Sequence, residues 1–422
     1  MANKLDAILE SYVADGDTTK GKLLGVAFVV VSKDGPIYQG SAGRTGIDPG
    51  SQAFTPHSIA WTASLSKLVT TLTLMHLVEH RDGEKKQHNN DQSILDEDAR
   101  PHVPELAELP ILRGFAEHAT ADKEEGDPLL EPNTAPITLR HLLSHTAGLG
   151  LDIADEVLDR WSRRVGRTAR ADNSSIAGWS TPLRFTPGDG WYYGTAIDWS
   201  GQVLERLVGR RLSEYMADHI LQPLGITGGT GFYIDRLLAG GRHLVTMTER
   251  DEQTGELRER DVPFPVDPPC ESGGAGLYTN AADYGRVLQE LLRALEGAEG
   301  AVIKKETAEE MFRPQLNEKQ REWLRSIVWK FGSAAEIPEG SSIDFGLGGM
   351  LNMEDVEGKQ KKGSMMWSGF SNGRWWIDPT TGIAGIMFPC FFPYSDPTAI
   401  ELYDKLERAV YADLVPDWQA SK

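Results

Sequence analysis

The chain lacks most of the features that mark secreted, membrane-spanning or nucleic-acid-binding proteins. Its 422 residues include two cysteines, Cys270 and Cys390, which are too few for a disulfide framework, so a reducing compartment is the simpler expectation. No apolar run approaches the roughly 20 residues that cross a bilayer, and the first residues lack the apolar core of a signal peptide. The net charge is −19 and basic residues adjoin one another only in pairs, which is too short for a phosphate-binding stripe. The sequence therefore predicts a cytoplasmic protein that binds neither nucleic acid nor membranes.

Strand patterns lie at both ends of the chain, and helical patterns dominate its middle. A hairpin is predicted to turn at residues 33–36, and from about residue 326 short strands are interrupted by glycine and proline. Residues 82–136 are polar and acidic, and residues 124–128 are the most loop-like part of them. Helices are predicted from apolar periodicity and capping residues over 5–13, 138–145, 153–165, 198–220, 281–296 and 397–414.

These elements predict a fold that is assembled from both termini around a helical middle. At 422 residues the chain can form one large domain or two domains that share a core. We expect an α/β (α+β) architecture in which residues 1–85 and 273–422 form a discontinuous sheet domain. Residues 86–272 are expected to form a mainly helical domain.

Ser64 is the only serine in the chain that precedes a lysine, Lys67, by three residues. In a helix these two positions share a face, so the lysine amine can reach the serine hydroxyl. Apolar residues recur with helical spacing from Leu68 to Val78, which places the pair at a helix start, where the helix dipole favours developing negative charge. Such a pair can form an acyl-enzyme, with the serine as nucleophile and the lysine as its base. The alternative is a serine cap beside a solvated lysine.

Two later clusters supply further parts of such a site. Residues 187–195 combine a Pro-Gly turn with Tyr193, ahead of a predicted helix. Residues 363–370 are predicted to form a strand, and its small residues would let a substrate lie against the backbone. A Ser-x-x-Lys motif, a tyrosine and a glycine-bearing strand, in this order, resemble the serine β-lactamases, the penicillin-binding proteins and their esterase relatives. Further segments match the same superfamily: residues 137–149, 222–226, 273–277, 345–349 and 375–379.

Within this superfamily the chain is most similar to the fungal lovastatin-pathway acyltransferases and the family VIII carboxylesterases. The resemblance implies a serine β-lactamase-like fold, an antiparallel sheet flanked by helices with a mostly helical inserted domain and the active site between the two. It implies Ser64 as the nucleophile, Lys67 and Tyr193 as the proton-transferring pair, and no metal or cofactor. The oxyanion hole would consist of the backbone amides of Ser64 and Phe370. Substrate binding would fall to Trp191, Thr195, Trp367, Ser368 and Gly369.

Two departures from the β-lactamase motifs bear on the substrate. The third motif of these enzymes has a lysine that helps bind a substrate carboxylate, and Trp367 stands at that position. The second motif has an amide-binding asparagine, which Thr195 replaces. Both changes weaken the recognition of β-lactams and peptides and leave the Ser-Lys-Tyr chemistry in place. Trp367 and Trp191 are interpreted either as walls of an apolar acyl pocket or as core residues.

The sequence thus predicts a serine hydrolase or acyltransferase that acts on small-molecule esters or thioesters through an acyl-enzyme on Ser64. A carboxylesterase or a transesterase fits best, with an acyl carrier as a candidate acyl donor. The alternatives are a β-lactamase, a D-amino-acid peptidase and a non-catalytic binding module. Free lysine and tyrosine are both protonated at neutral pH, so Lys67 and Tyr193 would have to share one proton, and either could be the formal base. Hydrolysis and transfer both stay open, because water and an alcohol attack the same intermediate.

A second serine motif competes with Ser64. Residues 369–373 satisfy the Gly-x-Ser-x-Gly pattern of α/β-hydrolases, with Ser371 at its centre. That pattern requires a helix directly after the serine and a histidine later in the chain. Strand-like residues follow Ser371, and the last histidine is His243, so we do not expect Ser371 to be a nucleophile.

Two histidine pairs have the spacing of metal ligands. His76 and His80 belong to a His-x-x-Glu-His pattern of zinc proteases, and His141 and His145 also lie four residues apart. Both pairs fall on predicted amphipathic helices, where surface or capping histidines are ordinary, and no separate helix offers an obvious third ligand. We therefore expect no metal site.

Overall fold

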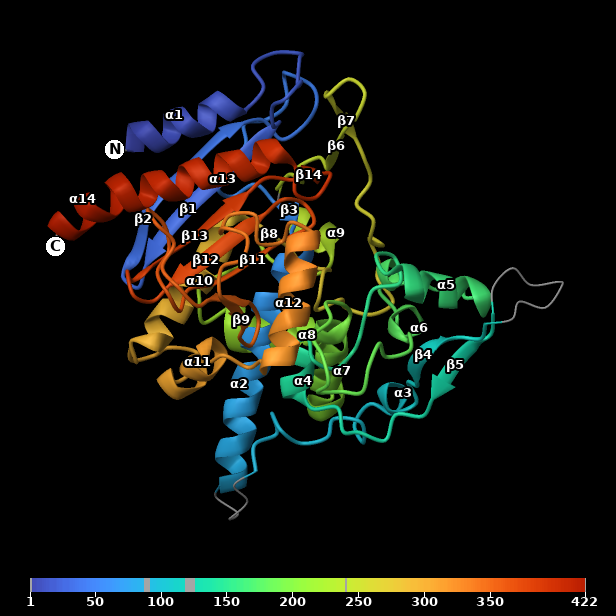
Figure 1. Cartoon of the computed structure of the whole chain (residues 1–422). Coiled ribbons are helices and arrows are strands. Elements are labelled where there is room, and N and C mark those ends of the chain that lie inside the picture. Colours follow the sequence, from blue (N-terminus) through green and yellow to red (C-terminus); the bar gives the residue numbers. More distant parts are fainter. Residues whose placement is uncertain (1, 87–91, 118–125, 240, 422) are drawn as a thin grey trace.

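Strands from both ends of the chain form one seven-stranded antiparallel sheet. The computed structural model describes residues 2–86, 92–117, 126–239 and 241–421 (Figure 1). The strands of the sheet are β1 (Gly25–Ser32), β2 (Gly35–Gly43), β9 (Ile343–Phe345), β10 (Met350–Asn352), β11 (Met365–Ser368), β12 (Arg374–Asp378) and β13 (Ile383–Phe388). Their order is β2-β1-β13-β12-β11-β10-β9, and every neighbouring pair is antiparallel. The predicted antiparallel sheet built from both termini is thus confirmed.

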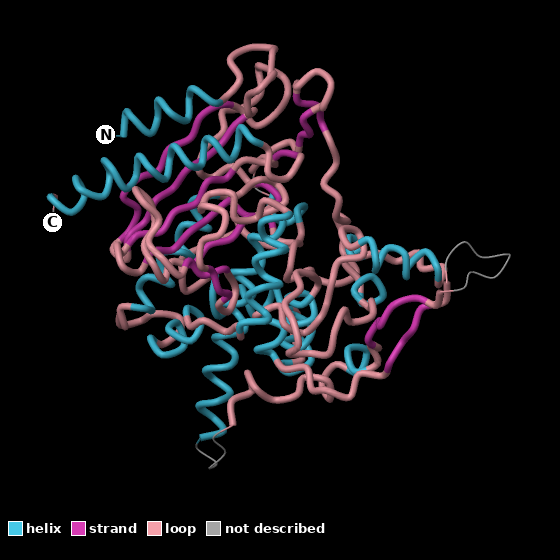
Figure 2. Tube along the Cα trace, viewed as in Figure 1, coloured by secondary structure: helices cyan, strands magenta, loops and turns pink. Residues whose placement is uncertain are grey.

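Helices cover the sheet, and helices and loops make up most of the region between its N-terminal and C-terminal strands (Figure 2). Among those that contact its strands are α1 (Ala2–Tyr12), α10 (Ala281–Leu295) and α13 (Pro397–Ala409). The others are α2 (Ser66–Lys86), α3 (Pro104–Ala107), α4 (Leu139–Leu143), α5 (Glu156–Arg164), α6 (Ile176–Trp179), α7 (Ala196–Val208), α8 (Leu212–Met216), α9 (Ile234–Leu238), α11 (Lys305–Phe312), α12 (Glu318–Lys330) and α14 (Val415–Ala420). Within the described part of the chain, no helix combines the length and the apolar character needed to cross a lipid bilayer.

Short strands outside the main sheet join distant parts of the chain. β3 (Ala60–Trp61), just before Ser64, pairs with β8 (Tyr278–Thr279). A hairpin, β4 (Ile111–Phe115) with β5 (Pro128–Glu131), lies at the edge of the helical region (Figure 1). β14 (Phe391–Phe392), β6 (Thr248–Arg250) and β7 (Leu257–Glu259) form a small mixed sheet.

The two faces of the main sheet contact different helices. Side chains alternate along a strand, so neighbouring residues of β1 point to opposite faces. Phe28 stacks on Trp376 of β12, which contacts Tyr403 of α13 edge-on, so α13 covers this face. Val29 points the other way, toward α10, where a Cβ added at Gly285 would lie 3.0 Å from the valine side chain. Since all eight residues of β1 are buried, the core of the molecule lies on both sides of this sheet.

Most predicted helices are confirmed to within a few residues, but two predicted ranges are wrong. The helix predicted over 198–220 divides into α7, α8 and a π-helical turn, because Gly209 ends α7 in the left-handed conformation with φ of 68°. Strands do not begin near residue 326, since α12 passes through this position. Leu324 and Val328 lie one turn apart on α12, and both are buried.

Two further predictions concern a loop that the structure describes only in part and the division of the chain into two domains. The loop predicted over 124–128 is described from Gly126 onward, and Pro128 already belongs to β5. Residues 124 and 125 lie outside the described residues. The division into a sheet domain and a helical domain at residues 85 and 272 stays a prediction.

A buried ion pair ties the sheet to the segment that follows α12. Arg374 of β12 donates to Glu336 over 2.5 Å, and the side chains of both residues are excluded from solvent. Among the described residues, Nε and Nη2 of Arg374 have no hydrogen-bond partner, so Glu336 is the main compensation for this guanidinium. The same segment contains Phe331 and Ser333, which line the cavity described below.

We expect Glu336→Gln to destabilise the protein by about 3–5 kcal/mol, because it leaves the Arg374 charge buried and unpaired. Glu339→Gln, at an exposed position of the same segment, is the matched control and should change stability by less than about 0.5 kcal/mol. Urea unfolding followed by tryptophan fluorescence measures both. Equal stabilities of the two variants would contradict the importance of the pair.

Candidate active site

Ser64 lies in a short 3-10 turn, η1 (Ala63–Leu65), between β3 and α2. The turn is closed by the Leu65 amide, which donates to the Thr62 carbonyl oxygen over 3.1 Å, and it is fixed to the segment before β8 by the Thr62 hydroxyl, which donates to the Leu277 carbonyl oxygen over 2.7 Å. Ala63 has a positive φ of 48°, which is rare for a residue with a Cβ and is found preferentially at functional sites. The local structure thus holds Ser64 firmly at the start of α2.

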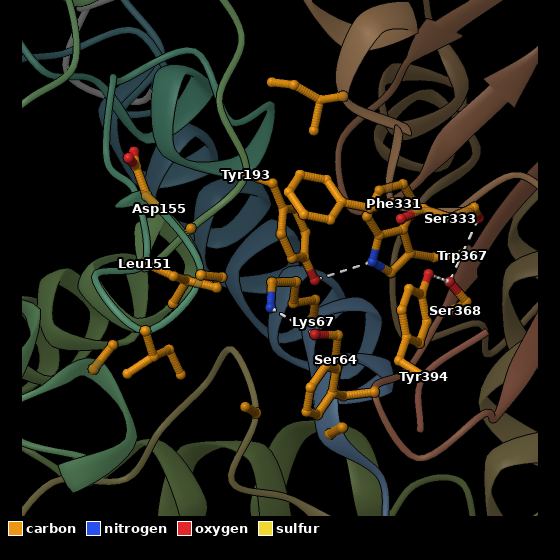
Figure 3. A pocket seen from close by; sticks show the side chains of 18 of the residues that line it. Ser64, Lys67, Leu151, Asp155, Tyr193, Phe331, Ser333, Trp367, Ser368 and Tyr394 are labelled. Atoms are coloured by element: carbon orange, nitrogen blue, oxygen red, sulfur yellow. Dashed lines mark hydrogen bonds between the residues drawn. The ribbon is translucent and has the colours of Figure 1, made fainter. Parts of the chain in front are cut away.

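The Lys67 amine lies within hydrogen-bonding distance of the Ser64 hydroxyl (Figure 3). Its Nζ donates to Ser64 Oγ over 3.2 Å and to the carbonyl oxygen of Gly274 over 2.8 Å. The same Nζ lies 4.6 Å from the centre of the Tyr193 ring. Lys67 is only 5% exposed, so its interactions with Ser64 and Tyr193 are little screened by water. The predicted spacing does bring the two groups together.

Tyr193 reaches the same place from the loop before α7. Its oxygen accepts a hydrogen bond of 3.1 Å from the indole Nε1 of Trp367, on β11 (Figure 3). Its ring is enclosed by the rings of Trp367, His145 and Trp191, whose centres lie 5.1, 4.8 and 6.4 Å away. Strand β11, the loop before α7 and helix α2 therefore meet around the Tyr193 side chain, next to the Lys67 amine.

Two buried titratable groups next to this site were not assigned a role from the sequence. Asp198, on α7, accepts hydrogen bonds from the Ser272 hydroxyl over 2.5 Å and the Gly274 amide over 3.0 Å. Burial raises the pKa of this carboxyl, and the nearby Lys67 charge opposes that shift. His145 is fully buried, and burial together with the Lys67 charge holds its pKa well below the ordinary value. The sequence did contain one indication of a role for Asp198, since it is an aspartate among the apolar residues of a predicted helix.

The three side chains open into a cavity of about 230 Å³ (Figure 3). Most of its walls are apolar or aromatic. Besides Ser64, Lys67 and Tyr193, the lining includes the predicted residues Trp191, Trp367, Ser368 and Phe370, and also Trp61, Leu151, Ile153, Tyr192, Phe264, Ile327, Val328, Phe331 and Tyr394. Ile153, Phe331 and Phe370 are each about half exposed, so the mouth of the cavity is apolar as well. The arrangement suits a largely apolar ligand.

Two of the predicted substrate-binding residues, Thr195 and Gly369, do not belong to the lining of this cavity. Thr195 is buried, and among the described residues its hydroxyl has no hydrogen-bond partner. Gly369 lies against the Ser64 turn, where an added Cβ would be 2.6 Å from the Leu65 side chain and 2.7 Å from the Thr62 carbonyl oxygen. Glycine is therefore required for the close approach of the end of β11 to this turn.

This close approach bears on the predicted oxyanion hole. Phe370 follows Gly369 directly, and in the described part of the chain its amide donates no hydrogen bond. An oxyanion hole needs backbone amides that are free to donate when charge develops on the substrate oxygen. Ser368, the residue before Gly369, forms a hydrogen bond of 2.7 Å between its hydroxyl and that of Tyr394, and both side chains line the cavity.

The competing motifs do not assemble a second site. Ser371 is 2% exposed, donates to the carbonyl oxygen of Trp61 over 3.3 Å and is followed by strand β12 instead of a helix. Glu79 accepts from the Lys304 amide and the Thr307 hydroxyl, so it lies toward α11. Its neighbour His76 instead bonds the Tyr215 hydroxyl. Across the described ranges, no group of three or more potential ligands is arranged to hold a metal ion.

Proteins of known activity resemble this chain along most of its length. The profile of the Beta-lactamase family matches residues 5–399. Monacolin J acid methylbutanoyltransferase of Aspergillus terreus is 30% identical over 360 residues, which cover 83% of this chain and 81% of the relative. Lovastatin esterase of Penicillium rubens is 29% identical over 382 residues, which cover 87% and 88% of the two chains. The solved structure of a simvastatin synthase mutant from Aspergillus terreus matches with a TM-score of 0.82 at 27% identity, and covers 97% of this chain and 94% of its own.

Proposed function

We propose that this chain, which belongs to the β-lactamase family, cleaves or transfers the acyl group of small-molecule esters or thioesters through an acyl-enzyme on Ser64. The relatives named above are an acyltransferase and an esterase. The observation that carries the proposal is the position of Lys67 Nζ, 3.2 Å from Ser64 Oγ, at the base of an apolar cavity that also holds Tyr193. Serine is a weak nucleophile until an adjacent base removes its proton, and this geometry provides such a base.

In the first half of the reaction, Ser64 Oγ attacks the carbonyl carbon of the ester and its proton passes to the Lys67–Tyr193 pair. The electron pair of the carbonyl bond moves onto the oxygen, and in this proposal the amides of Ser64 and Phe370 donate to it. When the tetrahedral intermediate collapses, the bond to the leaving oxygen or sulfur breaks. The leaving group takes the proton from Tyr193 or Lys67, and the acyl group remains on Ser64 as an ester.

In the second half, water or an alcohol repeats the same steps in the opposite direction. The acceptor gives its proton to the Lys67–Tyr193 pair, attacks the acyl carbon and displaces Ser64 Oγ, which recovers the proton. Water gives a carboxylic acid, and an alcohol gives a new ester. The apolar mouth formed by Ile153, Phe331 and Phe370 favours an apolar acceptor, so transfer would compete with hydrolysis when one is present.

The charge of the cavity favours an uncharged substrate. Among the described residues that line it, Lys67 is the one lysine or arginine, and its amine is already bonded to Ser64 and to the Gly274 carbonyl oxygen. Trp367 occupies the position of the carboxylate-binding lysine of the β-lactamases and donates to Tyr193 instead. A β-lactam or peptide carboxylate would therefore find no free cation.

We expect esters to be turned over far better than β-lactams. A charge-assisted hydrogen bond to a substrate carboxylate contributes roughly 1.5–3 kcal/mol, so its absence corresponds to about ten- to a hundredfold in discrimination. The measurement is kcat/KM for a p-nitrophenyl acyl ester and for nitrocefin, each divided by the rate of uncatalysed hydrolysis. Adding a primary alcohol and following the products by mass spectrometry separates transfer from hydrolysis.

A nitrocefin value that equals or exceeds the ester value would favour a β-lactamase or a D-amino-acid peptidase. A non-catalytic binding module would react with neither substrate. It would also remain unlabelled by a fluorophosphonate probe, whereas the proposed enzyme should be labelled at Ser64.

A further inference from the structure

We propose that Trp367 is a positioning residue whose indole N–H stabilises the negatively charged Tyr193 oxygen during acyl transfer. The inference rests on the proposed function, because it concerns the proton transfer of that reaction. Its basis is the hydrogen bond of 3.1 Å from Trp367 Nε1 to the Tyr193 oxygen (Figure 3). The sequence had interpreted Trp367 as a wall of the acyl pocket or a core residue, and the structure shows this additional contact.

The indole is held in a fixed orientation. Trp367 lies in the register of β11 opposite Trp375 of β12, in the interior of the seven-stranded sheet. Its ring meets that of Phe345 edge-on, with centres 5.5 Å apart, and only 4% of the residue is exposed. Because strand and side-chain packing both constrain the ring, the N–H points at Tyr193 before any substrate binds.

The direction of this hydrogen bond determines where the tyrosine proton can go. An indole nitrogen only donates, so the Tyr193 oxygen must be the acceptor. The phenolic proton is therefore directed away from Trp367, toward the side on which Lys67 and Ser64 lie. When Tyr193 gives this proton to the leaving group, its oxygen becomes negative and the indole N–H bond becomes charge-assisted. Reprotonation from the acceptor alcohol or water restores the neutral phenol.

Other titratable groups of the described chain line or face the same part of the cavity, from several elements and loops. They are Lys67 on α2, His145 after α4, Asp155 at the start of α5, Tyr192 beside Tyr193, Asp198 on α7 and Tyr394 before α13. Asp155 is paired with Arg184. His145 is uncharged at neutral pH, since burial and the Lys67 charge keep its pKa well below the ordinary value. Among the described residues, Lys67 is the one lysine or arginine whose side chain contacts the Tyr193 ring, and the Trp367 indole adds a neutral hydrogen-bond donor to the Tyr193 oxygen.

Trp191 provides a matched control inside the same cluster. It is also a fully buried tryptophan that lines the cavity and stacks on Tyr193, with an angle of 25° between the rings. Its indole nitrogen, however, has no hydrogen-bond partner among the described residues. Replacing either tryptophan with phenylalanine removes similar aromatic surface, but only Trp367→Phe removes a donor from Tyr193.

The experiment compares the pH dependence of kcat/KM for a p-nitrophenyl ester in the wild type, Trp367→Phe and Trp191→Phe. Loss of the indole donor disfavours the negatively charged form of the Tyr193 oxygen. In the pH profile of kcat/KM, the acidic limb of the Trp367→Phe variant should therefore move to higher pH by about one unit. At pH 7 this variant should lose about tenfold in kcat/KM, most of it in kcat, and should recover most of the loss above pH 9. Trp191→Phe should keep the position of the wild-type limb, whatever its overall rate.

An unshifted limb in Trp367→Phe, or an equal shift in both variants, would overturn the inference while leaving the proposed function intact. A wild type with no turnover of any ester would contradict the proposed function itself. A measurement on the wild type covers the case in which Trp367→Phe does not fold. The ¹⁵N–¹H resonance of one tryptophan indole should move with pH, and this movement should vanish in Tyr193→Phe. Indole resonances that do not respond to Tyr193→Phe would also overturn the inference.

Discussion

Ser64→Ala should abolish the turnover of a short p-nitrophenyl ester, with a loss on the order of 10⁴–10⁶ in kcat, because it removes the oxygen on which the proposed acyl intermediate forms. Ser371→Ala, which changes the serine of the competing motif, should keep most of the activity. Ser371 is buried, bonds the Trp61 carbonyl oxygen and is followed by a strand, so its hydroxyl is not presented to a substrate. Initial rates of the two variants, with circular dichroism to verify folding, make the comparison.

The two serines are a useful pair because both lie close to the same short strand. Ser371 contacts Trp61 of β3, and Ser64 follows this strand by three residues. A non-specific disturbance of this region would therefore affect both variants. Loss of turnover in Ser371→Ala with retention in Ser64→Ala would contradict the assignment of the nucleophile.

Lys67→Ala and Tyr193→Phe should each reduce kcat on the order of 10²–10⁴, the range of positioned acid–base groups. The Lys67 amine lies over the Tyr193 ring and bonds Ser64, and in the proposed mechanism the two residues handle the same proton. The double variant should therefore be little slower than the slower single variant, since the members of one catalytic unit are not additive. The measurement is kcat for the wild type, both single variants and the double variant with one ester.

A double variant whose loss is the product of the two single losses would show that Lys67 and Tyr193 act independently. Lys405→Ala serves as a control for the removal of a lysine, because Lys405 lies on the exposed side of α13, bonded to Tyr12 and Glu401. It should leave kcat unchanged to within about twofold, as expected for an exposed residue far from the chemistry.

The sequence predicted those parts of the site that depend on local spacing or on motif order. A three-residue interval in a helix is enough to place Lys67 beside Ser64, and the structure has this contact. The serine β-lactamase-like fold, expected from the resemblance, is confirmed by the family match and by the related solved structure. The β1–β2 hairpin and the helix predicted over 281–296, which is α10 with Asn280 as its N-cap, followed from strong local signals and are also confirmed.

The rest of the site depends on contacts between distant residues. Trp367 and Tyr193 are 174 positions apart, and no sequence pattern indicates that an indole nitrogen on one strand meets a phenol on another loop. Asp198 and His145 were not assigned roles for the same reason, since their positions next to Lys67 result from the packing of α7 and the loop after α4. Thr195 was predicted to bind substrate from its position in a motif, but its side chain is buried outside the cavity lining.

The central claim is that an acyl group is carried on Ser64, and intact-protein mass spectrometry during turnover tests it most directly. The protein is mixed with an acyl ester, quenched in acid within its first turnovers and weighed, and the modified peptide is then sequenced. The account predicts a mass increase equal to the acyl group minus one hydrogen, located on Ser64, discharged by an added alcohol and absent from Ser64→Ala. Ester turnover without an adduct on Ser64, or with the acyl group on Ser371, would contradict it.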